Sequence, residues 1–371
     1  MTFAVIQLKK ILLYFAVIIC VTLTVCFTVK QLHTPQDVYL QGGIPRSAPV
    51  PLATAAPKEY IKWVEFDVTY KMLEKTYLLD TGSQGKLNWI DILAYLGAKY
   101  GGTFSKYKEN DLTELVNRLE SGEKIEDIVV KMKYFEFYRE AYTAILGEFI
   151  GEYSVELYND DTSDLKVWHK KYGLKVFSPI AEGYDFSHYD DFGNSRSYGY
   201  KRRHLGHDLI GSTGTPIAAI ESGRVEVLGW NQYGGWRVGM RSFDGKRYYY
   251  YAHLRKDHPF QQSLKEGDIV KAGDIIGYLG RTGYSTTENV NNIDTPHLHV
   301  GMQLIFDESQ KESENQIWID MYAIIRLLQR NKVTVYRDID SKEYFRKYNF
   351  HEALLESVIL QQNAAELSKN S

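Results

Sequence analysis

The stretch that decides the fold is Thr295-Pro296-His297-Leu298-His299-Val300, in which two histidines stand one residue apart inside an apolar run. Side chains alternate between the two faces of a β-strand, so a strand here directs His297 and His299 to the same side. Both imidazoles would then face one cleft. Two partly exposed histidines on an edge strand would show the same local pattern, so the rest of the chain has to decide between these interpretations.

Short β-type runs separated by Gly-Asp, Asp-Gly and Gly-Gly turns make up the sequence around this stretch. Their spacing favours an antiparallel sandwich or a partly open barrel over βαβ units. The predicted strands are 216–220, 224–228, 236–241, 248–253, 274–279 and 298–305. Two helices are predicted after them, at 315–331 and 350–367.

The region from residue 58 to about residue 158 is predicted to be helical, because apolar residues recur there at helical spacing. Asn88 is a predicted N-cap, and Gly101-Gly102 is the predicted end of the helix that it begins. Acidic residues in this region could form a glycosidase pair, which would make the chain a muramidase as well. Solvated helix faces explain them better, so we assign this small bundle a spacer, docking or regulatory role and no chemistry.

An apolar run of 19 residues, Ile11 to Val29, lies between lysines and is about long enough to span a bilayer. It predicts an uncleaved signal-anchor, and the lysines before it favour a cytoplasmic amino terminus with the rest of the chain outside. Cys20 and Cys26 are both in this run, so the exterior part could hold a metal only through His, Asp or Glu. The net charge of −3 gives no argument for binding nucleic acid.

We therefore expect an α+β chain in five parts. They are a cytoplasmic tail and transmembrane anchor (1–30), a linker (31–57), a helical domain of unknown role (58–160), a catalytic domain built on an antiparallel sheet or open barrel (161–310), and a carboxy-terminal helical extension (311–371).

Four histidines and one aspartate can together form a metal site and its catalytic groups. His204 and Asp208 stand four residues apart and are bent by Gly206 into the start of a strand. With His299 they give three protein ligands and leave a fourth tetrahedral position for water, as catalytic zinc requires. His253 and His297 remain to accept a proton and to stabilise a charged intermediate.

The segment from about Ser195 to Ile305 resembles the lysostaphin-type (LytM-domain) zinc endopeptidases, which cut peptidoglycan. The motifs that carry the resemblance are His204-Leu205-Gly206-His207-Asp208, Tyr251-Ala252-His253-Leu254, Gly267-Asp268-Ile269-Val270, Gly280-Arg281-Thr282-Gly283 and Pro296-His297-Leu298-His299. The resemblance implies a twisted antiparallel sheet with a groove across it. It also implies one Zn²⁺ per chain on His204, Asp208 and His299, with His253 and His297 as the catalytic pair. The implied substrates are cross-bridge or stem peptides of the cell wall.

Some features depart from the family pattern or leave alternatives open. His207 replaces an apolar residue and is expected to face outward or to support the site, rather than to bind the metal. Gly301 stands where a glutamate often follows the last ligand. The polar segment 184–202 is expected to cover the groove. A non-catalytic module that binds the wall or a partner protein is the alternative function, but degeneracy would show as lost ligands and all five side chains are present.

Overall fold

The computed structural model describes residues 60–158, 165–197, 201–311 and 315–369. Residues 59–371 form one compact unit. The predicted signal-anchor and linker lie outside the described residues. Within the described ranges, none of the helices combines the length and the apolar character that a membrane crossing needs.

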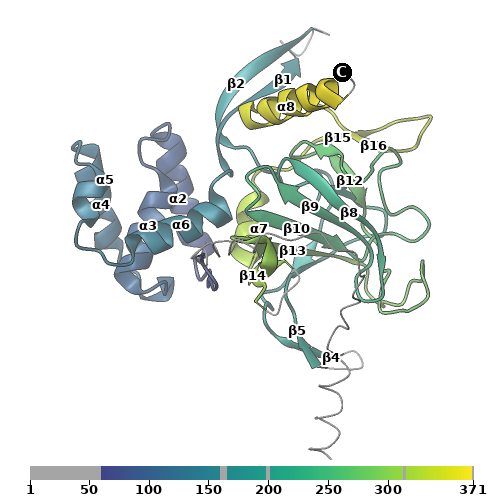
Figure 1. Ribbon diagram of the computed structural model, residues 1–371, viewed down its shortest axis with the longest axis horizontal. Coiled ribbons are helices and arrows are strands. Elements are labelled where there is room, and N and C mark those ends of the chain that lie inside the picture. Colours follow the sequence, from purple (N-terminus) through teal and green to yellow (C-terminus); the bar gives the residue numbers. More distant parts are fainter. Residues whose placement is uncertain (1–59, 159–164, 198–200, 312–314, 370–371) are drawn as a thin grey trace, which may run out of the picture. The chain divides into compact units, whose positions relative to one another are not determined.

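The first part of the described chain is helical, as the apolar periodicity predicts (Figure 1). Asn88 caps its helix by accepting hydrogen bonds from the backbone N–H groups of Ile90 and Asp91 through its side chain, and Gly101 ends that helix in the left-handed region at φ 63°. The helices are α2 (Tyr70–Gly82), α3 (Trp89–Tyr100), α4 (Glu109–Glu120), α5 (Ile125–Val129) and α6 (Phe135–Leu146), with a 3₁₀ turn at Phe104–Lys106.

A long hairpin follows the helices, where the sequence predicted first helix and then a transition. Strands β1 (Ile150–Tyr158) and β2 (Lys166–Leu174) pair antiparallel along their whole length, and β17 (Phe350–His351) adds to the other edge of β1. The start of the predicted helix 350–367 is therefore a strand, and α8 (Ala353–Lys369) begins after it. Strand pairing overrides the local preference in both places, with the distant strand β1 at residues 350–351 and mainly with the neighbouring strand β2 at residues 150–158.

The central sheet contains four of the six predicted strands, those at 224–228, 236–241, 248–253 and 298–305, and is antiparallel throughout. Its order is β11 (Ile269–Val270), β8 (Gly223–Asn231), β9 (Gly235–Ser242), β10 (Arg247–Ala252), β13 (His297–Leu304), β6 (His207–Ile210) and β3 (Ser187–His188). The predicted strands at 216–220 and 274–279 form a separate pair, β7 (Pro216–Ala218) and β12 (Ile275–Tyr278). The mixture of helices and antiparallel sheet agrees with the predicted α+β class.

The helix predicted at 315–331 is wrong in its first half. Residues Ile317–Ile319 form strand β14, which pairs with the second half of β13, and only Tyr322–Leu328 form a helix, α7. An apolar run this short does not distinguish a strand from a helix turn, and the free edge of β13 decides the outcome. Two small hairpins complete the fold, β4 (Ser195–Ser197) with β5 (Lys201–Arg203), and β15 (Val335–Arg337) with β16 (Tyr344–Arg346).

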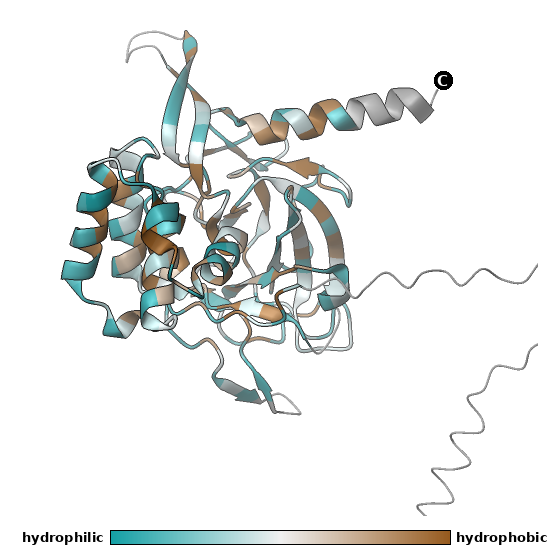
Figure 2. Ribbon diagram, turned by 60° about the vertical axis from the view of Figure 1, so that its left-hand side comes forward, coloured by the Kyte–Doolittle hydropathy of each residue, from teal (hydrophilic) through white to brown (hydrophobic). Residues whose placement is uncertain are grey.

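The helices and the central sheet share one hydrophobic core. Figure 2 shows hydrophilic residues on the outward side of the amino-terminal helices and hydrophobic residues on the side that they turn inward. A buried ion pair also joins the two parts. Arg247 on β10 is fully buried, contacts both carboxylate oxygens of Glu221 at 2.8 and 3.0 Å, and donates a hydrogen bond of 2.6 Å to the carbonyl of Ala144 on α6.

Candidate functional site

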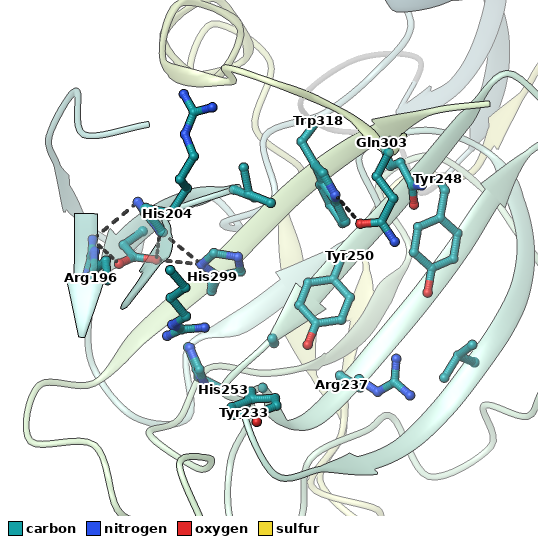
Figure 3. A pocket seen from close by; sticks show the side chains of 18 of the residues that line it. Arg196, His204, Tyr233, Arg237, Tyr248, Tyr250, His253, His299, Gln303 and Trp318 are labelled. Atoms are coloured by element: carbon teal, nitrogen blue, oxygen red, sulfur yellow. Dashed lines mark hydrogen bonds and ion pairs between the residues drawn. The ribbon is translucent and has the colours of Figure 1, made fainter. Parts of the chain in front are cut away.

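The central sheet brings the three predicted metal ligands together (Figure 3). His204 lies just before β6, Asp208 is on β6, and His299 is opposite Asp208 on β13. Asp208 Oδ1 is 2.8 Å from His299 Nδ1 and 3.1 Å from His204 Nε2, and the two ring nitrogens are 3.2 Å apart. Ligands at tetrahedral zinc, about 2.0–2.1 Å from the ion, are about 3.3 Å apart, so the set has the right size for such an ion.

The contacts of the other ring nitrogen of His204, Nδ1, also support a metal site. This Nδ1 is 3.1 Å from Asp191 Oδ1, which accepts, and 3.3 Å from Arg196 Nη2, which donates. The shorter contact, with Asp191, favours the proton on Nδ1 and a lone pair on Nε2. That lone pair points at a carboxylate oxygen of Asp208. Two acceptors that face each other repel unless a cation lies between them, so the donor set fits a divalent metal.

Two residues that the sequence did not indicate support the ligands. Arg196 on β4 donates to Asp208 Oδ2 at 2.9 Å and also contacts Asp191, which in turn holds His204. Asp208 therefore offers one oxygen to the cluster while Arg196 occupies the other. Both residues come from the segment 184–202, which the sequence suggested only as a cover. No motif marks them, because their role depends on a hairpin that folds back onto the sheet.

We expect Arg196→Ala to weaken zinc binding by about 10- to 100-fold, because the second oxygen of Asp208 and the carboxylate of Asp191 would lose their common partner. Competition with a chromophoric chelator measures the zinc affinity directly. Arg203→Ala is the matched control, since Arg203 is on the other strand of the same hairpin and contacts none of the three ligands. An equal loss in both variants would argue against this role for Arg196.

His253 and His297 lie beside the metal cluster with their rings 4.7 Å apart between centroids. The Nδ1 of His253 is 2.9 Å from the carbonyl of Thr282, and the Nδ1 of His297 is 2.8 Å from the carbonyl of Thr295. A carbonyl only accepts, so each Nδ1 carries a proton, and Nε2 presents a lone pair in the neutral form of each ring. The Nε2 of His297 is 3.8 Å from Asp208 Oδ1. Burial, reinforced by His297 and His299, holds the pKa of His253 well below its usual range and keeps the imidazole neutral.

The backbone at His253 departs from the strand that the sequence predicts over residues 248–253. Regular alternation in that strand would put Tyr249, Tyr251 and His253 on one face. Tyr249 and Tyr251 do point into the core, where their hydroxyls contact Glu221 and the N–H of Ile220. However, β10 ends at Ala252, and His253 has a left-handed backbone at φ 61° that turns its ring into the cleft instead. This backbone conformation is energetically unfavourable for a residue other than glycine. Such conformations cluster at functional sites.

Gly206 and His207 are explained by the packing around the ligands. A Cβ on Gly206 would lie 2.4 Å from ring atoms of His299, so only glycine lets the chain pass this ligand. His207 is fully buried, not outward-facing, because it points to the face of β6 opposite Asp208. Its Nε2 is 2.7 Å from Nδ1 of His188, and burial together with His188 lowers its pKa to about 4. It is not part of the ligand set.

The departure at Gly301 also has a structural reason. Trp318 on β14 packs over this position, and a Cβ there would lie 2.7 Å from its indole ring. The unpredicted strand β14 thus carries an aromatic side chain to the wall of the cleft. Tyr250 on β10 lies between Trp318 and His299, with ring-centroid distances of 6.3 and 6.0 Å.

The ligands lie at one end of a cleft of about 500 Å³. His253, Tyr250 and Arg237 line its floor, and Trp318 and Gln303 line its far side (Figure 3). The cleft is therefore elongated along the sheet, and its dimensions suit part of an extended chain better than a small spherical ligand.

Known proteins with similar sequences include peptidases. Residues 202–313 match the family model described as Peptidase family M23. The L-Ala–D-Glu endopeptidase of Bacillus subtilis is 37% identical over 153 residues, which are 41% of this chain and 43% of that protein. Lysostaphin of Staphylococcus staphylolyticus is 43% identical over 97 residues, which are 26% of this chain and 18% of lysostaphin.

A solved structure, the catalytic domain of the antimicrobial peptidase lysostaphin from Staphylococcus simulans, matches 38% of this chain and 92% of that chain at 32% identity and a TM-score of 0.29. The chain spans less than half the length of the two curated relatives named above.

Proposed function

Because residues 202–313 of this chain belong to the lysostaphin-type (LytM) metalloendopeptidase family, we propose that the chain is a zinc endopeptidase that hydrolyses peptide bonds in peptidoglycan. One observation carries the proposal. Three ligand atoms converge in the cleft, and two imidazoles with fixed tautomers lie beside them. We also propose that residues 1–30 anchor the chain in the cell membrane, with the described part facing the wall.

The proposed roles follow from the geometry of the side chains. His204, Asp208 and His299 would hold the ion, which when bound supplies a Lewis acid that acidifies water and polarises a peptide carbonyl. In their neutral forms His253 and His297 accept at Nε2, so each could take a proton from the attacking water and return it to the leaving amine. The backbone carbonyls of Thr282 and Thr295 keep these tautomers in place.

The proposal predicts how purified peptidoglycan changes on incubation with the full-length, zinc-loaded protein. We expect one new amino group and one new carboxylate for each cut, with no new reducing sugar ends, because the residues of the site suit acyl transfer and not glycoside chemistry. Mass spectrometry of the soluble products identifies the cut bond, and treatment with a chelator should stop the reaction until zinc is restored. New reducing ends would indicate a muramidase, and zinc-bound protein that leaves the wall intact would support the non-catalytic binding module.

A further inference from the structure

We propose that Arg237 recognises a free carboxylate of the substrate peptide, and that the cleft therefore selects anionic peptides over neutral ones such as glycine chains. This inference rests on the proposed function and names the substrate class of the same site. It starts from the charge of the cleft. Five basic residues line it, but Asp208 is its only acidic lining residue among those that the structure describes. Asp208 is already engaged by its two histidines and by Arg196.

Arg237 differs from Arg196 and Lys311 in this cleft because no carboxylate neutralises it. Arg202 and Arg203 also lack a carboxylate among the described residues, but Arg202 donates to the hydroxyl of Tyr284 and lies over its ring, and Arg203 is exposed. Arg196 pairs with Asp191 and Asp208, and Lys311 pairs with Glu226. Arg237 makes no ion pair with any described residue, and its buried Nε has no hydrogen-bond partner there. A buried guanidinium N–H without an acceptor is energetically unfavourable. A ligand with a planar pair of acceptor oxygens, such as a carboxylate, would accept hydrogen bonds from this guanidinium.

The strand register places Arg237 at a useful distance from the metal cluster. His299 is opposite Ala252, and the pairing of Val238 with Tyr251 puts Arg237 opposite Ala252 on its other side. The two residues are thus two strands apart on one face, which is about 10 Å between Cα atoms. Ala252 between them is too small to block the path. Figure 3 shows the guanidinium of Arg237 beside Tyr250, on the floor of the cleft.

This spacing limits where the carboxylate lies in the substrate. An extended peptide advances about 3.3 Å per residue, and the arginine side chain itself covers part of the gap. A scissile carbonyl at the metal cluster then brings a carboxylate one or two residues away over Arg237. An acidic residue within the peptide or a free chain end could supply it. The planar fork of arginine suits either source.

Matched synthetic wall peptides test the inference in the full-length, zinc-loaded protein. The parent peptide keeps all its carboxylates, a second has the carboxylate of its internal acidic residue converted to carboxamide, and a third has only its terminal carboxylate converted. We expect the wild type to cleave the parent with a kcat/KM about 10- to 100-fold above that of one of the two amides, which identifies the source. Arg237→Gln should remove this advantage, whereas Arg237→Lys should keep part of it.

A control variant and a second readout separate this role from general electrostatics and from folding. Lys170→Gln removes one exposed positive charge on the β1–β2 hairpin, outside the cleft, and should leave the preference unchanged. Tryptophan fluorescence of the metal-free chain, in which Trp318 lines the cleft, should show tighter binding of the parent peptide and loss of that difference in Arg237→Gln. The melting temperature of Arg237→Gln should equal that of the wild type.

The outcomes are distinguishable. Equal cleavage of all three peptides by the wild type would overturn the inference and leave the proposed function standing. A preference that survives in Arg237→Gln would also overturn it, since another residue would then read the carboxylate. Cleavage of none of the peptides by zinc-loaded protein would overturn the proposed function and the inference with it.

Discussion

Replacing His299 by alanine is expected to reduce bound zinc from about one ion per chain to nearly none and to lower kcat/KM on wall peptides by more than about 1,000-fold. His299 supplies one of only three ligand atoms, and its Nδ1 is also the partner of Asp208 at 2.8 Å. Without it, only two of these ligands remain, and one of them, Asp208, is still held by Arg196. Metal analysis of the dialysed full-length protein and a peptide-cleavage assay measure the two effects.

His253→Ala is the matched control for this prediction. His253 lies beside the cluster, with its ring centroid 5.8 Å from that of His299, but contributes none of the three ligand atoms. We expect this variant to keep its zinc and to lose activity, because a proton acceptor would be missing while the ion stays in place. If His299→Ala retains a full equivalent of zinc, the assignment of the ligands is wrong. If His253→Ala retains full activity, its catalytic role is wrong.

Replacing Arg247 by methionine is expected to lower the free energy of unfolding by about 3–5 kcal/mol, because it leaves Glu221 buried without its partner. Arg247 is fully buried, and Glu221 is 5% exposed. The change also removes the hydrogen bond to the carbonyl of Ala144, which links α6 to the sheet. Urea denaturation followed by circular dichroism measures the loss.

Lys170→Met provides the comparison for Arg247. Lys170 forms an ion pair with Glu152, but both side chains are more than 60% exposed, so the expected change is below about 1 kcal/mol. A double variant that also replaces Glu221 by methionine should recover part of the stability lost in Arg247→Met, since the buried carboxylate of Glu221 would be gone and only Asp244, whose side chain is 30% exposed, would lose an ion-pair partner. A loss below about 1 kcal/mol in Arg247→Met would show that the buried pair contributes little to stability.

Much of the candidate site could be predicted because its residues have local signatures. Alternation in a strand puts His297 and His299 on one side, and the structure does place both rings next to Asp208. The supporting residues have no such signature. Asp191 and Arg196 reach the ligands only because the β4–β5 hairpin folds back, and Trp318 reaches the cleft only because β14 pairs with β13.

The incorrect predictions have a common physical cause. The sequence indicated helix at 315–331 and placed no strands at 150–174, but pairing with another strand determines the outcome in each place, with β13 in the first and between the two strands of the hairpin in the second. The turn at His253 is a similar case, because simple alternation would point this side chain into the core. Its left-handed backbone is held by the surrounding loops, and its N–H donates to the carbonyl of Gly234.

The sequence by itself determined the helices with clear periodicity and caps, the long strands β8, β9, β10 and β13 of the central sheet, and the five residues expected to carry the chemistry, because these depend on local spacing and side-chain type. Only the tertiary structure decided how those residues are supported, which face His253 presents, and how Arg247 joins the helices to the sheet. It also left Arg237 without a carboxylate in the cleft. These features depend on contacts between segments far apart in the chain, and local spacing carries no information about them.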